Sequence, residues 1–124
     1  MRSALATYQQ VDRSGLIEGS SPVGIVRTLF GELEQQIVRL SDAPLASAAR
    51  GDAVSRAIAI VLTLQGSLDF EHGGEVAQNL ARIYDWLRRT LLTSLREPNE
   101  DNLRSAARIA ADFHDAWRRI GSQG

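Results

Sequence analysis

Apolar residues recur at steps of three and four in four separate stretches of the chain, and this spacing constrains the fold more than any other feature. In each stretch the apolar side chains fall on one face of an α-helix, which predicts an amphipathic helix with one buried side. The first stretch begins at Pro22, and the other three cover about 52–65, 74–96 and 100–120. Because short links join them, we expect an all-α protein, an antiparallel four-helix bundle.

Proline, serine and glycine mark the expected helix ends. Ser21 before Pro22 predicts a helix start, since the serine hydroxyl can accept a backbone N–H and proline is tolerated at the first helical position. Pro44 either ends the first helix or kinks it. Gly51 before Asp52 predicts a stop and a new N-cap.

The chain of 124 residues is long enough for one small domain with a single core. Residues 1–21 carry little helical periodicity and end in a stretch rich in glycine and serine, so we expect a flexible N-terminal arm or lid. Residues 22–120 make up the predicted bundle, and we expect residues 121–124 to be a disordered tail.

Composition excludes several classes of function. The chain has no cysteine, which removes disulfides, thiolate metal sites and cysteine nucleophiles. Its formal net charge is −1, so no surplus of positive charge favours nucleic acids or anionic membranes. No apolar run is long enough to span a bilayer, and the N-terminus does not resemble a secretory leader. We therefore expect a cytosolic protein with no cofactor, no nucleic-acid partner and no membrane insertion.

Two sets of polar residues could carry chemistry. The run 69–75 holds Asp69, Glu71, His72 and Glu75, which are residue types that bind metals. Two glycines between His72 and Glu75 leave that spacing loose, so a helix N-terminus with a capping aspartate is the simpler interpretation. His72 or His114 could accept a phosphoryl group as in phosphotransfer bundles, but neither has the sequence context of those histidines, and His114 is more simply a surface residue.

Arginines in the last two predicted helices have acidic neighbours three or four residues away. This pattern predicts a charge-paired, solvated surface rather than a nucleic-acid site. The expected pairs join Asp85 with Arg88 and Arg89, Arg108 with Asp112, and Asp115 with Arg118 and Arg119.

The second predicted helix has more apolar surface than one seam can bury. Val54, Ile58 and Leu68 share one face, whereas Ile60 and Leu62 spread apolar area around the helix. An excess of this kind commonly marks a groove that accepts a partner helix.

Residues 67–86, SLDFEHGGEVAQNLARIYDW, resemble the signature of the flagellin export chaperone family, FliS. The family typically shows Ser-Leu-Asp-x-Glu-x-Gly-Gly-Glu-[Ile/Val]-Ala-x-Asn-Leu, followed by a Tyr-Asp-aromatic step. Further matches, Tyr8-Gln9 and Asp115-Ala116-Trp117 among them, extend the likeness over essentially the whole chain. Trp86 and Phe30 depart from it, because tyrosine is common at both positions.

The resemblance implies a cytosolic, non-enzymatic export chaperone built as a four-helix bundle. Such proteins bind the C-terminal segment of flagellin in apolar grooves, prevent its premature polymerisation and support flagellar type III secretion. Their N-terminal arm can cover part of that surface, and flagellar regulators or the export apparatus are further partners. The partner-binding residues expected on this basis are Tyr8, Ile58, Leu62, Leu68, Asn79, Leu80, Ile83 and Tyr84. The alternatives are a histidine phosphotransfer bundle and a self-associating helical bundle.

Overall fold

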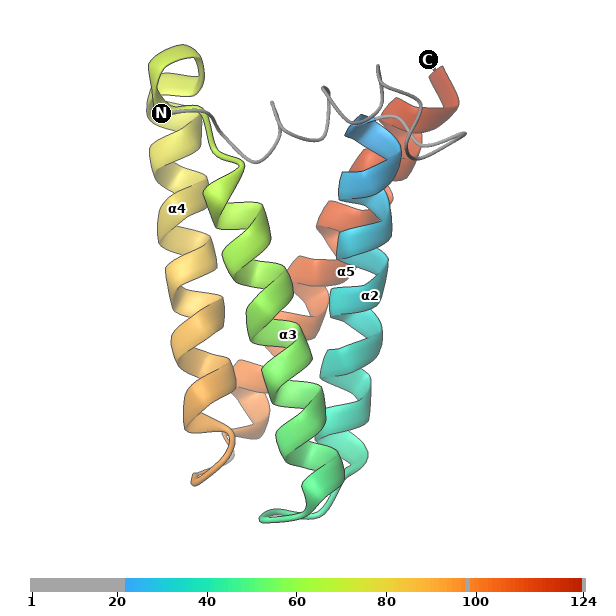
Figure 1. The fold of residues 1–124 in the computed structure, drawn as a ribbon, viewed down its shortest axis with the longest axis vertical. Helices are drawn as coiled ribbons and strands as arrows, with labels where there is room; N and C mark the ends of the chain where they lie inside the picture. Colours follow the sequence, from blue (N-terminus) through green and yellow to red (C-terminus); the bar gives the residue numbers. More distant parts are fainter. Residues whose placement is uncertain (1–21, 98, 124) are drawn as a thin grey trace.

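The computed structural model describes residues 22–97 and 99–123. Within these ranges the chain forms four helices and no strand: α2 (Pro22–Asp42), α3 (Ala48–Gly66), α4 (Phe70–Thr93) and α5 (Glu100–Gln123). Successive helices run in opposite directions (Figure 1). The predicted all-α four-helix bundle is therefore confirmed, whereas the predicted arm, residues 1–21, lies outside the described residues.

The helices pack as an open row rather than as a closed ring. α2 packs along both α3 and α5, and α3 packs along α4, whereas α4 and α5 contact each other only slightly. Figure 1 shows α4 and α5 near each other where the chain connects them and well apart at their other ends. We call the end with the α4–α5 connection the closed end, and the end with the α3–α4 connection the open end.

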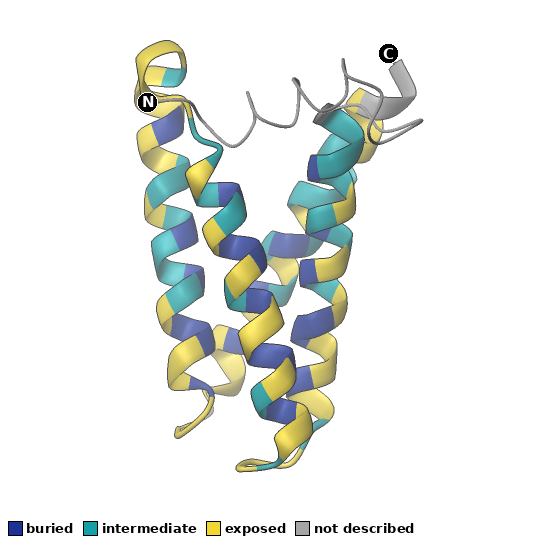
Figure 2. Cartoon of the chain, in the orientation of Figure 1, coloured by how far each residue is buried: buried dark blue, intermediate teal, exposed yellow. Residues whose placement is uncertain are grey.

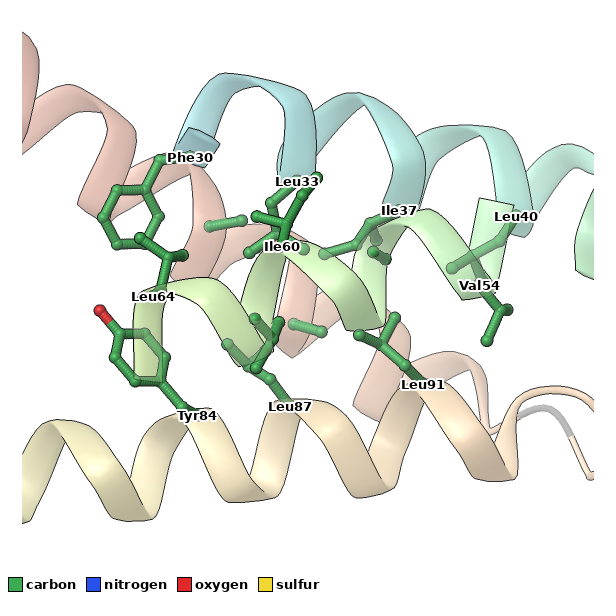
Figure 3. Close-up of a cluster of buried hydrophobic side chains, with 14 of the residues drawn as sticks. Phe30, Leu33, Ile37, Leu40, Val54, Ile60, Leu64, Tyr84, Leu87 and Leu91 are labelled. Atoms are coloured by element: carbon green, nitrogen blue, oxygen red, sulfur yellow. The ribbon is translucent and has the colours of Figure 1, made fainter. Parts of the chain in front are cut away.

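The core consists of the apolar face of each helix (Figures 2 and 3). Leu33 and Ile37 of α2 are fully enclosed and belong to one cluster with Leu87 and Leu91 of α4. On α5 the buried residues are mostly small, namely Leu103, Ala106 and Ala110. The steps of three and four in the sequence thus identify the buried faces correctly, and the alanines allow α5 to approach α2 closely.

At the closed end a buried arginine joins three helices. Arg50, in the first turn of α3, is 4% exposed. Its Nη1 donates to the carbonyl oxygens of Leu40 at 2.8 Å and Ala43 at 3.0 Å, and its Nε donates to the carbonyl of Ser94 at 3.0 Å. These carbonyls lie at the C-terminal ends of α2 and α4, where unsatisfied acceptors and the helix dipole favour a cation.

The predicted start of the second helix at Asp52 is wrong. α3 begins at Ala48, and the Oγ of Ser47 accepts the backbone N–H of Arg50 at 3.1 Å, as a serine N-cap does. Gly51 therefore lies inside the helix. Pro44 comes after the end of α2 at Asp42, so it ends the first helix and does not kink it.

α4 begins at Phe70, before the predicted start near Gly74, and is interrupted at Gly74 itself. The Oδ1 of Asp69 accepts the N–H groups of Glu71 and His72, each at 3.1 Å, which confirms the prediction of a capped helix N-terminus. Gly74 then adopts φ +50° and ψ −124°, a conformation that L-residues with a Cβ avoid.

The other two helix ends differ from the prediction by a few residues. α4 ends at Thr93 rather than Arg96, and its last turn continues as hydrogen-bonded turns through Glu97. α5 starts at Glu100 as predicted, with Asn99 Oδ1 accepting the N–H of Asn102 at 3.0 Å, and it continues past Ile120 to Gln123. Helix ends fray, so such differences are ordinary.

Candidate partner-binding groove

An apolar groove of about 530 Å³ lies at the open end of the bundle, where α4 and α5 have separated. Because the two helices do not cover each other there, their apolar faces and part of the core remain accessible. We call this the open-end groove. Its lining comes from all four helices and the α3–α4 connection: Val26, Phe30, Leu64, Ser67, Leu68, Asp69, His72, Gly73, Val76, Ala77, Leu80, Tyr84, Phe113, Ala116 and Trp117.

Aromatic side chains form the α2 and α5 side of the open-end groove. The rings of Phe30 and Phe113 meet edge to face, with centroids 5.4 Å apart and planes at 79°. Trp117, one turn further along α5, is half-buried, and Val76 of α4 is 66% exposed. A valine this exposed in an apolar setting is typical of a surface that a partner covers.

Tyr84 forms part of the floor of the groove. The side chain is 4% exposed, and Figure 3 shows its ring leaving α4 with the hydroxyl on the side of Leu64 and Phe30. Within the described part of the chain no group is hydrogen-bonded to this hydroxyl. Burial in apolar surroundings raises the pKa of Tyr84 to about 12, so the phenol is neutral at physiological pH.

Asp69 and His72 make the polar rim of the groove. His72 Nδ1 lies 2.7 Å from Asp69 Oδ2, and this contact is the main cause that lowers the pKa of the Asp69 carboxyl. Both side chains are exposed, so the pair is a surface contact. Nowhere in residues 22–97 and 99–123 do three histidine or acidic side chains come together as a metal site would require.

The structure brings together only part of the predicted site. Leu68, Leu80 and Tyr84 line the open-end groove. Ile58 and Ile83 are half-buried and pack against the core beside it.

The remaining predicted residues lie elsewhere. Leu62 and Asn79 are exposed and do not line the groove, and Asn79 Oδ1 accepts a hydrogen bond from Arg82 Nη1 at 2.9 Å. Tyr8 lies outside the described residues.

Several groove residues were missed by the sequence prediction. Val76, Phe113 and Trp117 sit on the periodic apolar faces, where the pattern indicates ordinary packing between helices. Helical periodicity shows which face is apolar but not whether a neighbour covers it. No local signal in the sequence shows that α4 and α5 separate at one end.

His114 is not the simple surface residue that the sequence suggested. It is half-buried between α5 and α2, with Nδ1 3.3 Å from Glu34 Oε1. A Cβ built on Gly31 would lie 3.2 Å from both Cε1 and Nε2 of the imidazole, so the absent side chain at Gly31 makes room for the ring. His114 therefore takes part in the contact between the two helices.

The predicted arginine pairs are present. Asp85 pairs with Arg88 at 2.5 Å and Arg89 at 3.2 Å, Arg108 with Asp112 at 4.0 Å, and Asp115 with Arg118 at 2.9 Å and Arg119 at 2.8 Å. The two arginines lower the pKa of the Asp115 carboxyl, with the hydrogen bond from Arg118 the larger cause.

Among the described helices none is sufficiently long and apolar to cross a membrane.

Comparison with known proteins places these features in a family. The sequence model of the flagellar protein FliS matches residues 4–124. A flagellar secretion chaperone FliS of Salmonella typhimurium is 29% identical over 123 residues, which cover 95% of this chain and 90% of that protein. FliS of Vibrio cholerae is 25% identical over 97% of this chain and 90% of its own length, and FliSB of Pseudomonas aeruginosa is 28% identical over 94% of both.

Proposed function

Since the chain belongs to the FliS family of flagellar secretion chaperones, we propose that it binds the C-terminal segment of flagellin and holds it for export. Bound in this way, the segment is kept from polymerising before type III secretion. The proposed setting is the cytosol, and the export apparatus or flagellar regulators are further proposed partners. The observation that carries the proposal is the open-end groove.

The open-end groove has the character of a site for an amphipathic helix. Its wall is apolar and partly aromatic, and Asp69 and His72, its two ionisable residues other than Tyr84, lie at the rim. A helix that inserts its apolar face into such a groove buries area that drives association, while its polar face stays in water. Leu68, Leu80 and Tyr84 are the predicted binding residues that support this placement.

Ile58, Leu62, Asn79 and Ile83 lie outside the groove, and we propose that they contact a partner that continues over α3 and α4. Leu62 is exposed, and Ile58 lies one turn away on the same side of α3. A segment that leaves the groove could follow this apolar strip. The open-end groove remains the main proposed binding site, and the contact over α3 and α4 would add to it.

Isothermal titration of the chain with monomeric flagellin tests the proposal. Full-length flagellin is expected to bind, and flagellin lacking its last ~40 residues is expected not to bind, a length comparable with what a bundle of this size can accommodate. Equal behaviour of the two flagellins would contradict the proposal. Light scattering of the chain alone separates it from self-association, for which a dimer or larger species is required.

A matched pair of valine variants tests the location of the site. Val76 lines the groove and is 66% exposed, whereas Val38 of α2 is 53% exposed outside it, so both can be replaced without disturbing the core. Val76→Asp is expected to weaken flagellin binding by at least about tenfold, because the complex must bury a charge in an apolar groove. Val38→Asp is expected to bind as the unchanged chain does. The reverse result would place the site elsewhere.

The N-terminal arm is proposed to act as a lid over the binding surface, with Tyr8 as the residue that covers it. A tyrosine suits this role because its ring can bury apolar area while its hydroxyl stays in water. Deletion of residues 1–19 is then expected to raise the affinity for flagellin. Unchanged affinity after the deletion would exclude a lid that competes with the partner.

A further inference from the structure

The hydroxyl of Tyr84 is a polar group set in the apolar floor of the open-end groove. The tyrosine is only 4% exposed, and no described residue is hydrogen-bonded to its Oη. The Tyr84 hydroxyl is not fully enclosed. In the described structure, the side-chain atoms that are both fully enclosed and without a hydrogen-bond partner belong to Gln36, Arg50 and Arg88. It therefore keeps access to the groove.

Any segment that fills the groove removes solvent from this hydroxyl. A purely apolar segment would leave the hydroxyl buried and unpaired, which costs binding affinity. A segment that places a hydrogen-bonding group opposite Oη avoids this cost. The groove therefore discriminates between partners by polarity at one position as well as by apolar fit.

We propose that the segment bound in the open-end groove carries a neutral amide or hydroxyl side chain, from Asn, Gln, Ser or Thr, within its apolar face, and that this group hydrogen-bonds Tyr84 Oη. The inference rests on the proposed function, so the segment is the C-terminal region of flagellin. A side chain is required because the backbone groups of a bound helix are already paired within the helix. A neutral group is required because the surrounding lining is apolar, and a buried carboxylate or ammonium would be unfavourable.

Tyr84→Phe tests the hydrogen bond, because it removes one oxygen and keeps the ring. In the free chain the variant is expected to unfold at the same temperature or higher, since the hydroxyl has no partner to lose. Its dissociation constant for monomeric flagellin is expected to rise about tenfold, because the partner's polar group is then left unpaired. Thr90→Val is the matched control: it also removes a hydroxyl from a buried side chain of α4, outside the groove, and is expected to bind flagellin normally.

Alanine variants of flagellin locate the polar partner. Each Asn, Gln, Ser and Thr in the last ~40 residues is replaced in turn and titrated against the unchanged chain and against Tyr84→Phe. One position is expected to weaken binding to the unchanged chain and to have no further effect with Tyr84→Phe, the signature of a directly coupled pair.

Three results would overturn the inference while leaving the proposed function intact: normal binding by Tyr84→Phe, a lower unfolding temperature of the free variant, or no coupled position in flagellin. Failure of the unchanged chain to bind any flagellin would overturn the proposed function, and this inference with it.

Discussion

At the scale of single residues, Arg50 joins three helices through its side-chain hydrogen bonds. The carbonyl oxygens it binds end α2 and α4, while the residue itself belongs to the first turn of α3. No carboxylate in the described residues pairs with it, so its charge is stabilised by backbone acceptors at the negative ends of two helices. One guanidinium thus caps the C-terminal ends of two helices through three hydrogen bonds.

Arg50→Met is expected to destabilise the chain by about 2–4 kcal/mol, because it removes three hydrogen bonds and leaves the carbonyls of Ala43 and Ser94 without the donor that Arg50 provides. Urea unfolding followed by circular dichroism at 222 nm measures the change. Arg56→Met is the control, since Arg56 is exposed on the same helix and its replacement is expected to change stability by less than about 0.5 kcal/mol. Equal stability of the two variants would show that the buried hydrogen bonds contribute little.

Among the helices, α3 and α4 each contain a glycine near the N-terminus, and the two glycines have opposite roles. Gly51 lies inside α3 with open space where a Cβ would be placed, so nothing in the fold requires glycine there. Gly74 interrupts α4 with φ +50°, so the chain requires glycine for its backbone conformation and not for space. The Gly-Gly pair of the family signature therefore includes a position with a physical requirement for glycine.

Alanine at these two positions is expected to change stability in opposite directions. Gly51→Ala should stabilise the chain by about 0.5–1 kcal/mol through helix propensity. Gly74→Ala should destabilise it by about 1–3 kcal/mol, because alanine is strained in that conformation. Thermal unfolding of the two variants measures both changes, and a shift of the same sign in both would contradict the backbone argument.

The cap of α4 is expected to depend on pH through Asp69. The pKa of its carboxyl is lowered from 3.8, chiefly by the hydrogen bond with His72. A carboxyl whose folded pKa is lowered contributes stability that is present above the unfolded pKa and is lost as pH falls through the folded value. The cap should therefore hold at neutral pH and weaken only in acid, below pH ~4.

Carbon-13 NMR of the Asp69 carboxyl tests this expectation. Its titration midpoint should lie below 3.8 in the unchanged chain and move up toward 3.8 in His72→Ala. The same midpoint in both chains would assign the shift to the backbone N–H groups of the cap instead.

For the molecule as a whole, stability is expected to differ between the two ends of the bundle. Arg50 and enclosed residues such as Leu91 lie at the closed end, whereas α4 and α5 have separated at the open end. Regions with fewer buried contacts open more readily and exchange their amide hydrogens faster.

Hydrogen exchange followed by mass spectrometry measures this difference along α4. Amides of residues 76–84 are expected to exchange at least about tenfold faster than those of residues 87–93 in the free chain. Added flagellin should slow exchange in the first group and leave the second unchanged. Uniform exchange along α4 would contradict the distinction between the two ends.

The sequence predicts what depends on local pattern and fails where the outcome depends on distant neighbours. Periodicity identifies the apolar faces, and the spacing of Asp69 and of the arginine pairs identifies a cap and a charged surface. The start of α3 was predicted wrongly because Gly51-Asp52 is a plausible stop. The structure instead begins α3 after Ser47, in a turn where Arg50 bonds to two other helices that the local pattern does not show. Val76 and Trp117 look like core residues in sequence, since their exposure depends on how two helices diverge.

The hydrogen bonds of Arg50 anchor α2 at the closed end, far from the part of α2 that lines the open-end groove. They anchor the C-terminal ends of α2 and α4 to the first turn of α3, so a tilt of α2 about the closed end would give displacements that grow with distance from it. A helix of 21 residues such as α2 is about 30 Å long at ~1.5 Å per residue. A rotation of only about 5° would then move its far end by about 2.5 Å, the scale of one methyl group. A tilt of α2 about its anchored end would thus change the width of the open-end groove, which Val26 and Phe30 of α2 line.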